Sequence, residues 1–271
     1  MGALHAHVAP NEAPDRVLRE TTDAAEAPAR LQAACAGRLV RVDRSWYASP
    51  MSRLSDEITK AMQPGMVVPA PLEQLFTWME TNGRVRDDGD GRLVGCLHSA
   101  EEQRTGWTDT ERRGGTLIEF AAHADEALDN WFGNSDPAVL NRLSVFARTG
   151  GDGSRAAFWL APDGVQRIVH LGSGSGSTLV CVLGDEPVDF LRLLAIGYDE
   201  ICWSEAFARP PNVGPAVDFI VHPNLAFQSW VRETFATTIP STALEVARHP
   251  ASMDDDDSPD PFWKWVRASR R

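Results

Sequence analysis

The sequence predicts an α+β fold, because its helical and β patterns fall in different parts of the chain. From about Leu143 to Val182, short apolar runs alternate with glycine-rich turns, a pattern typical of consecutive strands. Segments with the apolar spacing of amphipathic helices precede and follow this region. The chain has 271 residues, 43% of them apolar, and nine tryptophans, which support a substantial core.

The first helix that the pattern strongly predicts covers residues 69–83. Pro71 suits a first helical turn, Asn82-Gly83 suits a helix end, and the apolar residues between them form one stripe. Before it, residues 1–48 are rich in Ala, Glu, Asp, Arg and Pro. We expect them to be a partly disordered N-terminal extension with one short helix at 29–40 and no signal peptide.

A strand is predicted at 93–97 and a second helix at 116–133. In that helix, the residues expected to face the core are Ile118, Ala121, Ala122, Ala124 and Leu128.

Four apolar runs then predict successive strands, at 143–149, 155–161, 165–172 and 178–184. Asp163-Gly164 between two such runs is a hairpin signal. Further helices are predicted at 186–201, with Pro187 near its start and Gly197 near its end, and at 224–236.

The run "GSGSGST" at 172–178 raises three alternatives: a phosphate-binding loop, a flexible linker or a turn. A Walker loop needs a lysine after its last glycine, and a dinucleotide fingerprint needs glycine at position 177, where this chain has Ser177. Both motifs must also open a helix, whereas the β-branched and apolar residues that follow predict a strand. We therefore expect a turn between two strands.

Other residues are of the types found in reactive sites, but they lack the sequence spacing that such sites need. Glu119 and His123 share a face of the predicted helix but lack the two-histidine zinc pattern, so a solvated polar face is expected. Cys181, His170 and Asp185 have the residue types of a cysteine hydrolase, yet apolar neighbours bury a thiol without activating it. The Asp-Gly clusters "DDGDG" and "GGDGS" lack the twelve-residue ligand spacing, ending in Glu, of a calcium-binding loop. No catalytic residue, metal or cofactor is expected.

The segment from Phe146 to Trp203 resembles the SUKH superfamily of Smi/Knr-like proteins. The matching features are the Gly150–Ser154 turn, the Trp159-Leu160 pair, the "IVHLGS" strand and turn, and the "DFLRLLAIGYDE" helix. The tail "NLAFQSWVRETFATTIP" with "DPFWKWV" is similar to the C-terminal extension of bacterial members. The 172–177 turn departs from the family, since it has no acidic residue where many relatives have Glu after "LGS".

The resemblance implies a mixed, largely antiparallel sheet flanked by helices, with a SUKH-like core at 49–208 and a C-terminal helical extension at 209–271. It also implies a non-enzymatic immunity protein that binds and neutralises a cognate bacterial toxin of a polymorphic toxin system. A basic nuclease or deaminase is the first expectation for that toxin. The alternatives are a scaffold or regulatory protein of the Smi/Knr type and, less expected, a hydrolase.

The net charge of −12 agrees with a basic protein partner and disfavours nucleic acid, although acidity also simply promotes solubility. We expect a cytoplasmic monomer or weak dimer with no membrane partner, because no apolar run has the length of a membrane span. Trp203 and Cys202 are expected in the core. The residues expected to contact the partner, chosen for charge and exposure, are Asp152, Asp163, Asp199, Glu200, Asp254, Asp255, Asp256 and Asp257.

Overall fold

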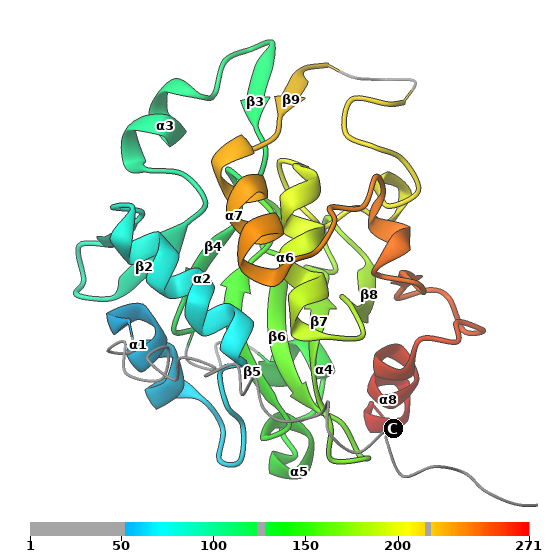
Figure 1. Ribbon diagram of the computed structural model, residues 1–271. Helices are drawn as coiled ribbons and strands as arrows, with labels where there is room; N and C mark the ends of the chain where they lie inside the picture. Colours follow the sequence, from blue (N-terminus) through cyan, green and yellow to red (C-terminus); the bar gives the residue numbers. More distant parts are fainter. Residues whose placement is uncertain (1–51, 124–127, 215–217, 271) are drawn as a thin grey trace, which may run out of the picture. The chain divides into compact units, whose positions relative to one another are not determined.

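An eight-stranded antiparallel sheet forms the centre of the computed structural model, which describes residues 52–123, 128–214 and 218–270 (Figure 1). All of them belong to the compact unit Ser49–Arg271, so residues 209–271 pack in the same unit as the predicted core. The predicted N-terminal extension, with its short helix, lies outside the described residues. The order of the strands is β1 (Val85–Asp87), β2 (Leu93–Cys96), β4 (Glu119–Ala121), β5 (Leu143–Arg148), β6 (Arg155–Leu160), β7 (Gln166–Leu171), β8 (Leu179–Val182) and β10 (Ala251–Ser252).

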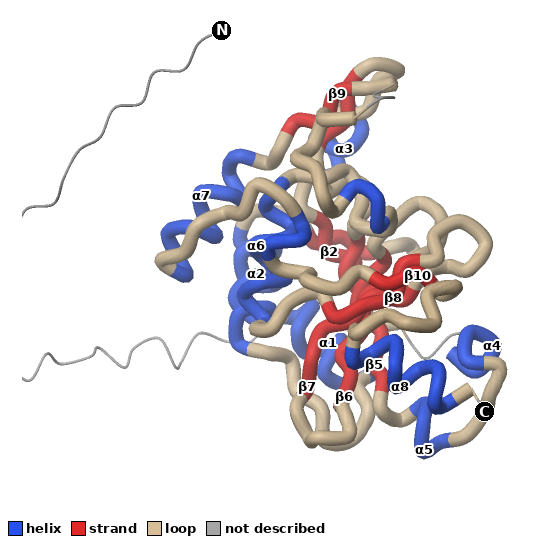
Figure 2. The backbone as a smooth tube through the Cα atoms, turned by 90° about the vertical axis from the view of Figure 1, so that its right-hand side faces the viewer, coloured by secondary structure: helices blue, strands red, loops and turns tan. Residues whose placement is uncertain are grey.

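Helices cover both faces of this sheet (Figure 2). One face carries α1 (Arg53–Ala61), α2 (Ala70–Thr81), α6 (Pro187–Ile196) and α7 (Leu225–Phe235), and the other carries α4 (Leu128–Phe132), α5 (Pro137–Leu140) and α8 (Pro261–Ser269). The predicted class, α+β with a largely antiparallel sheet flanked by helices, is confirmed.

The double cover explains why the central strands read as nearly continuous apolar runs. Along β6, Ala156 and Phe158 belong to the core under α2 and α6, while Ala157 and Trp159 belong to the core under α8. Side chains of a strand alternate between faces, so a sheet buried on both sides needs apolar residues at every position.

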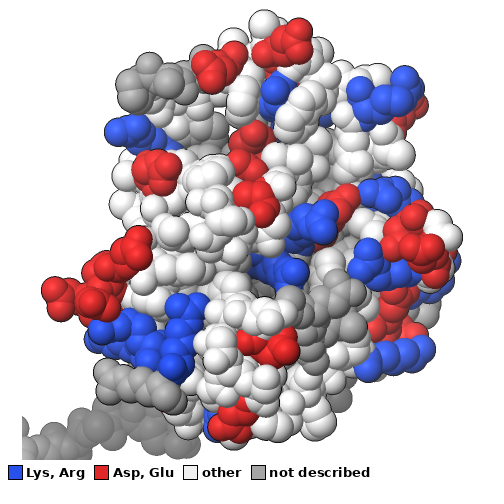
Figure 3. Space-filling view, turned by 180° about the vertical axis from the view of Figure 1, so that it is seen from behind, with Lys and Arg blue, Asp and Glu red and all other residues white. Residues whose placement is uncertain are grey.

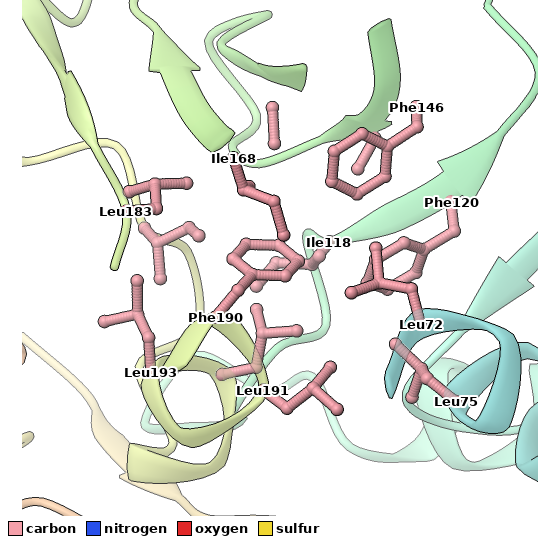
Figure 4. Packing of buried hydrophobic residues seen from close by; sticks show 14 of the residues in the cluster. Leu72, Leu75, Ile118, Phe120, Phe146, Ile168, Leu183, Phe190, Leu191 and Leu193 are labelled. Atoms are coloured by element: carbon pink, nitrogen blue, oxygen red, sulfur yellow. The ribbon is translucent and has the colours of Figure 1, made fainter. Parts of the chain in front are cut away.

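Aromatic packing fills the core under α2 and α6, the largest of three buried clusters among the described residues (Figure 4). The rings of Phe146 and Phe158 stack with their centroids 4.2 Å apart, and Phe190 of α6 meets Phe146 edge-on at 5.8 Å. A shift of register between Val145 and Ala147 puts two consecutive residues of β5, Phe146 and Ala147, in this same core. A β-bulge has this effect, because it adds one residue to one strand of a pair.

The predicted helices at 69–83, 186–201 and 224–236 are observed as α2, α6 and α7, with slightly different ends. The end of α6 has a local cause, since Gly197 adopts a left-handed φ of 101° that terminates the helix. The start of α7 is fixed by the Asn224 side chain, which accepts a hydrogen bond from Phe227 N.

The prediction of one helix at 116–133 is wrong. Residues Glu119–Ala121 form β4, between β2 and β5, and only Leu128–Phe132 are helical, as α4. Tertiary packing decides this: Phe120 is fully buried, and its ring lies 5.8 Å from that of Phe76. Among the residues expected to face the core, Ile118, Ala121 and Leu128 are buried and Ala122 is half-buried; Ala124 lies outside the described residues.

Three further elements lie beyond the main sheet. Strands β3 (Glu111–Arg113) and β9 (Ile220–His222) form a small parallel pair, and α3 (Ala100–Thr105) lies on the same side (Figure 1). No helix in the described part of the chain combines the length and the apolar character that crossing a membrane requires.

Candidate partner-binding surface

Asp152 connects two turns at one end of the sheet. It lies in the β5–β6 turn, and its carboxylate accepts four hydrogen bonds: from Ser154 N (3.0 Å) and Oγ (2.8 Å), from Ser173 Oγ (2.7 Å) and from Ser177 N (2.8 Å). Burial alone raises the pKa of this group, but these hydrogen bonds outweigh it and lower the pKa of Asp152 to about 2. Asp152 is therefore ionised, and its carboxylate oxygens accept hydrogen bonds from the protein's own serine residues.

The glycine-serine run at 172–177 is the turn between β7 and β8, as predicted. Ser173 and Ser177 tie it to Asp152, and the Ser177 hydroxyl donates to the carbonyl oxygen of Cys202. A Cβ on Gly172 would lie 2.6 Å from Ser177 O and 2.8 Å from Leu179 O, so this turn closes too tightly for a side chain there. It is a fixed turn rather than a linker.

Asp199 and Glu200 follow α6, and Glu200 lies against the β5–β6 turn. Glu200 accepts a hydrogen bond from Gly151 N at 3.0 Å and another from the Trp203 ring nitrogen. Asp199 is half-buried, and burial, together with the neighbouring Glu200 carboxylate, raises the pKa of Asp199. The charged, exposed site expected at Asp199 is thus partly withdrawn from solvent.

The expectation that Trp203 is a core residue is wrong. Its side chain is 36% exposed, whereas Cys202 is fully buried, as expected. The cause is local: the backbone at Trp203 is extended (φ −114°, ψ 110°), so consecutive side chains point in opposite directions. Cys202 takes the interior position beside Gly150, where an added Cβ would meet its Sγ at 2.6 Å, and Trp203 consequently points outward.

A small hollow lies beside Trp203. Its volume is about 180 Å³, and it is lined by Gly176, Thr178 and Leu179 of the β7–β8 segment and by residues 202–205. We call it the Trp203 hollow. Glu205 and Ser204 were not among the residues predicted for the site, although the short acidic sequence "DEICWSE" was a usable signal, since its acids flank Trp203.

The acidic run 254–257 begins next to the β7–β8 turn. Met253 N donates to Thr178 O at 2.9 Å, and the hydroxyls of Thr178 and Ser252 are 2.9 Å apart. All four aspartates are exposed, but Asp256 forms an ion pair with Arg267 at 3.0 Å.

Asp163 lies at the other end of the strands, in the β6–β7 hairpin. Its side chain accepts hydrogen bonds from Arg167 at 2.7 and 3.0 Å, and these contacts lower the pKa of Asp163 to about 2. It is therefore separated from the other predicted residues by the length of β6. We use "the acidic surface" for the acids of the segments that meet at this end of the sheet: Asp152, Glu200, Glu205 and Asp254.

Charge of both signs is present elsewhere on the protein. Seen from behind, acidic and basic side chains are interspersed along the right-hand side, and one acidic group projects at the left edge above a basic group (Figure 3). The net charge of −12 is thus the sum of acidic and basic groups that share the surface.

The hydrolase alternative meets a physical obstacle at Cys181. The thiol is fully buried, and burial raises its pKa well above 9.0, which disfavours the nucleophilic thiolate. His170 lies opposite Cys181 across the β7–β8 pair, but its ring nitrogens contact Leu179 O (2.9 Å) and Thr149 Oγ1 (3.0 Å). Since Leu179 O only accepts, Nδ1 carries the proton and Nε2 accepts from Thr149. Asp185, the third residue, is exposed and pairs with Arg248 at 2.7 Å.

Glu119 and His123 do not share a helix face, because Glu119 lies in β4 and His123 follows that strand. Glu119 pairs with Arg86 at 2.8 Å. Within residues 52–123, 128–214 and 218–270, no group of three or more His, Cys, Asp or Glu side chains is placed to hold a metal ion.

Comparisons with protein-family models, with curated proteins and with solved structures found no match to this chain.

Proposed function

We propose that this protein is an immunity protein, which binds a basic bacterial toxin and blocks its active site without performing chemistry itself. The observation that carries the proposal is the convergence of four chain segments at one end of the sheet. The β5–β6 turn, the β7–β8 turn, residues 199–205 and the start of the acidic run meet there, and Glu200 and Glu205 lie beside the exposed Trp203.

Rigidity of this end of the sheet supports tight binding. The carboxylate of Asp152 bonds both turns, and Glu200 bonds both the β5–β6 turn and Trp203. A surface fixed in this way loses little conformational freedom when a partner docks, so less of the interaction energy is offset by ordering.

Charge and aromatic character have separate roles in the proposed interface. A negative surface accelerates and selects encounters with a basic partner. An exposed tryptophan is the residue type that most often contributes a large share of binding energy at an interface. Glu205 and Asp254, whose side chains are exposed, are the carboxylates placed for direct contact.

The resemblance of residues 146–203 to the SUKH superfamily supports the same proposal, because many bacterial members neutralise toxins. A toxin that acts on nucleic acid needs a basic groove to hold phosphates. A rigid acidic surface fits such a groove by charge, so we propose a nuclease or nucleic-acid deaminase as the target and occlusion of its groove as the mechanism.

The test is co-expression with the product of a neighbouring gene that is toxic when it is expressed alone. We expect the chain to restore growth and to co-purify with the toxin. The exchange Glu205→Lys/Asp254→Lys should weaken binding by about 10-fold or more, equivalent to about 1.4 kcal/mol.

The matched control is Glu101→Lys/Glu233→Lys, which also replaces two exposed carboxylates with ammonium groups. These residues lie on α3 and α7, away from β8 and β10 (Figures 1 and 2). The control should bind as the unmodified chain does. Unrelieved toxicity and no complex would refute the immunity function, and a growth defect on gene loss without any toxin would favour the regulatory alternative.

A further inference from the structure

We propose that the Trp203 hollow receives the guanidinium group of one arginine side chain from the partner. This inference rests on the proposed function and specifies the chemistry of one contact within it. It follows from the size of the hollow, from its lining, and from how the other exposed tryptophan of the described chain is covered.

The hollow has the size of a side-chain site. Small-molecule pockets commonly measure about 300–1,000 Å³, whereas this hollow measures about 180 Å³. It therefore has space for the head of one long side chain and too little for a nucleotide or a typical organic ligand.

The lining has the chemistry that a cation needs. Trp203, Thr178, Ser204 and the acidic Glu205 are among the residues that line the hollow, and no Lys, Arg or His is among them. The Trp203 ring nitrogen donates to Glu200, which places a second carboxylate at the edge of the indole. A cation over the indole face would be attracted by the ring and by both carboxylates.

The tryptophans of this chain provide an internal comparison. Trp107, which is 42% exposed, is covered by Arg112, whose guanidinium carbon lies 4.0 Å from the ring centroid. Guanidinium groups also lie over several less exposed indoles, those of Trp78, Trp131, Trp159 and Trp263. Within the described residues, Trp203 is an exposed tryptophan with no such cation over its ring.

Arginine suits this site better than lysine. The guanidinium is planar, so it can stack on an indole and still donate two parallel hydrogen bonds to a carboxylate. Lysine has a compact, strongly hydrated ammonium that cannot do both. The site is therefore expected to select arginine over lysine at equal charge.

The experiment titrates the ¹⁵N-labelled full-length chain with N-acetyl-arginine amide and, separately, with N-acetyl-lysine amide. The indole N–H signal of Trp203, assigned by its loss in Trp203→Phe, reports binding. We expect arginine amide to shift this signal with a dissociation constant at least about 3-fold lower than that of lysine amide, as cation–π contacts at exposed sites suggest. Glu205→Gln should weaken arginine binding by about 3-fold, the size typical of an exposed ion pair.

Glu233→Gln on α7 is the matched control and should leave the titration unchanged. Equal shifts with the two amides, or equal effects of the two glutamine variants, would overturn the inference. If the toxin still binds normally to Trp203→Ala and Glu205→Gln, this inference fails and the immunity function stands. If arginine selectivity is found but no toxin is bound, the immunity function fails and the arginine site stands.

Discussion

At the scale of single residues, one carboxylate organises the end of the sheet that we assign to binding. Asp152 bonds its own turn through Ser154 and the neighbouring turn through Ser173 and Ser177. Ser154 and Ser177 are buried, so the donors that face Asp152 have little access to replacement water. A charge chosen from the sequence as a contact residue thus has mainly a structural role.

Replacing Asp152 should therefore reduce stability. Asp152→Ala leaves buried donors without an acceptor, and we expect the free energy of unfolding to fall by about 2 kcal/mol. Urea denaturation measures this change. Asp163→Ala removes an equal charge from an exposed hairpin and should cost much less; equal losses would contradict the role assigned to Asp152.

His170 predicts how stability depends on pH. Complete burial lowers its pKa from the ordinary 6.5 to about 4 in the folded protein, against a smaller opposing effect of Leu179 O. Between these values the unfolded chain binds a proton that the folded chain does not, so this contribution to stability is lost as the pH falls from 6.5 to 4.

Urea denaturation at several pH values checks the prediction. The slope of unfolding free energy against pH in this window should flatten in His170→Gln, which does not titrate. An unchanged slope would show that His170 is not the group responsible. Asp152, with its lowered pKa, contributes its own loss only at lower pH, between 3.8 and about 2.

At the scale of elements, the two turns depend on glycines whose surroundings differ. We expect Gly172→Ala to destabilise the protein by about 1–3 kcal/mol, because its Cβ would press on backbone oxygens that cannot move independently. Gly151→Ala is the control, since its Cβ would meet Leu117 Cδ1 at an ordinary 3.6 Å. Urea midpoints compare the two variants, and a similar loss in both would exclude steric closure as the reason for Gly172.

The sequence predicts the central elements well because their signals are local. Strands β5 to β8 are apolar runs bounded by glycine turns, and α2 and α6 have clear start and stop residues. Strand β4 was missed because three residues are too few to show a period, and alanines around it fit a helix equally well. Its conformation depends on Phe120 packing against Phe76 and Phe146, which are distant in sequence.

The candidate site could be predicted only in part, for a similar reason. Its acids are visible as charges in the sequence, but their convergence requires the antiparallel order that brings the β5–β6 and β7–β8 turns to the same end. The outward position of Trp203 depends on Cys202 occupying the interior beside Gly150. Neither relation is encoded within a single segment.

At the scale of the whole molecule, the described part of the chain has a sheet packed on both faces, with acidic residues gathered at one end of its central strands. The core helices fix the sheet on both faces, so the turns project from a stable base. The net charge of −12 acts over longer distances than any single contact and is screened by salt. Charge should therefore govern the association rate of the proposed partner. The contacts around Trp203 should govern its dissociation rate.

The rate of association with the proposed toxin partner, measured by stopped flow from 50 to 500 mM NaCl, tests the central claim most directly. We expect the rate constant to fall by about 10-fold or more across this range, and Glu205→Lys/Asp254→Lys to start lower and depend less on salt than Glu101→Lys/Glu233→Lys. A rate that does not depend on salt, or that both exchanges change equally, would contradict recognition through the acidic surface.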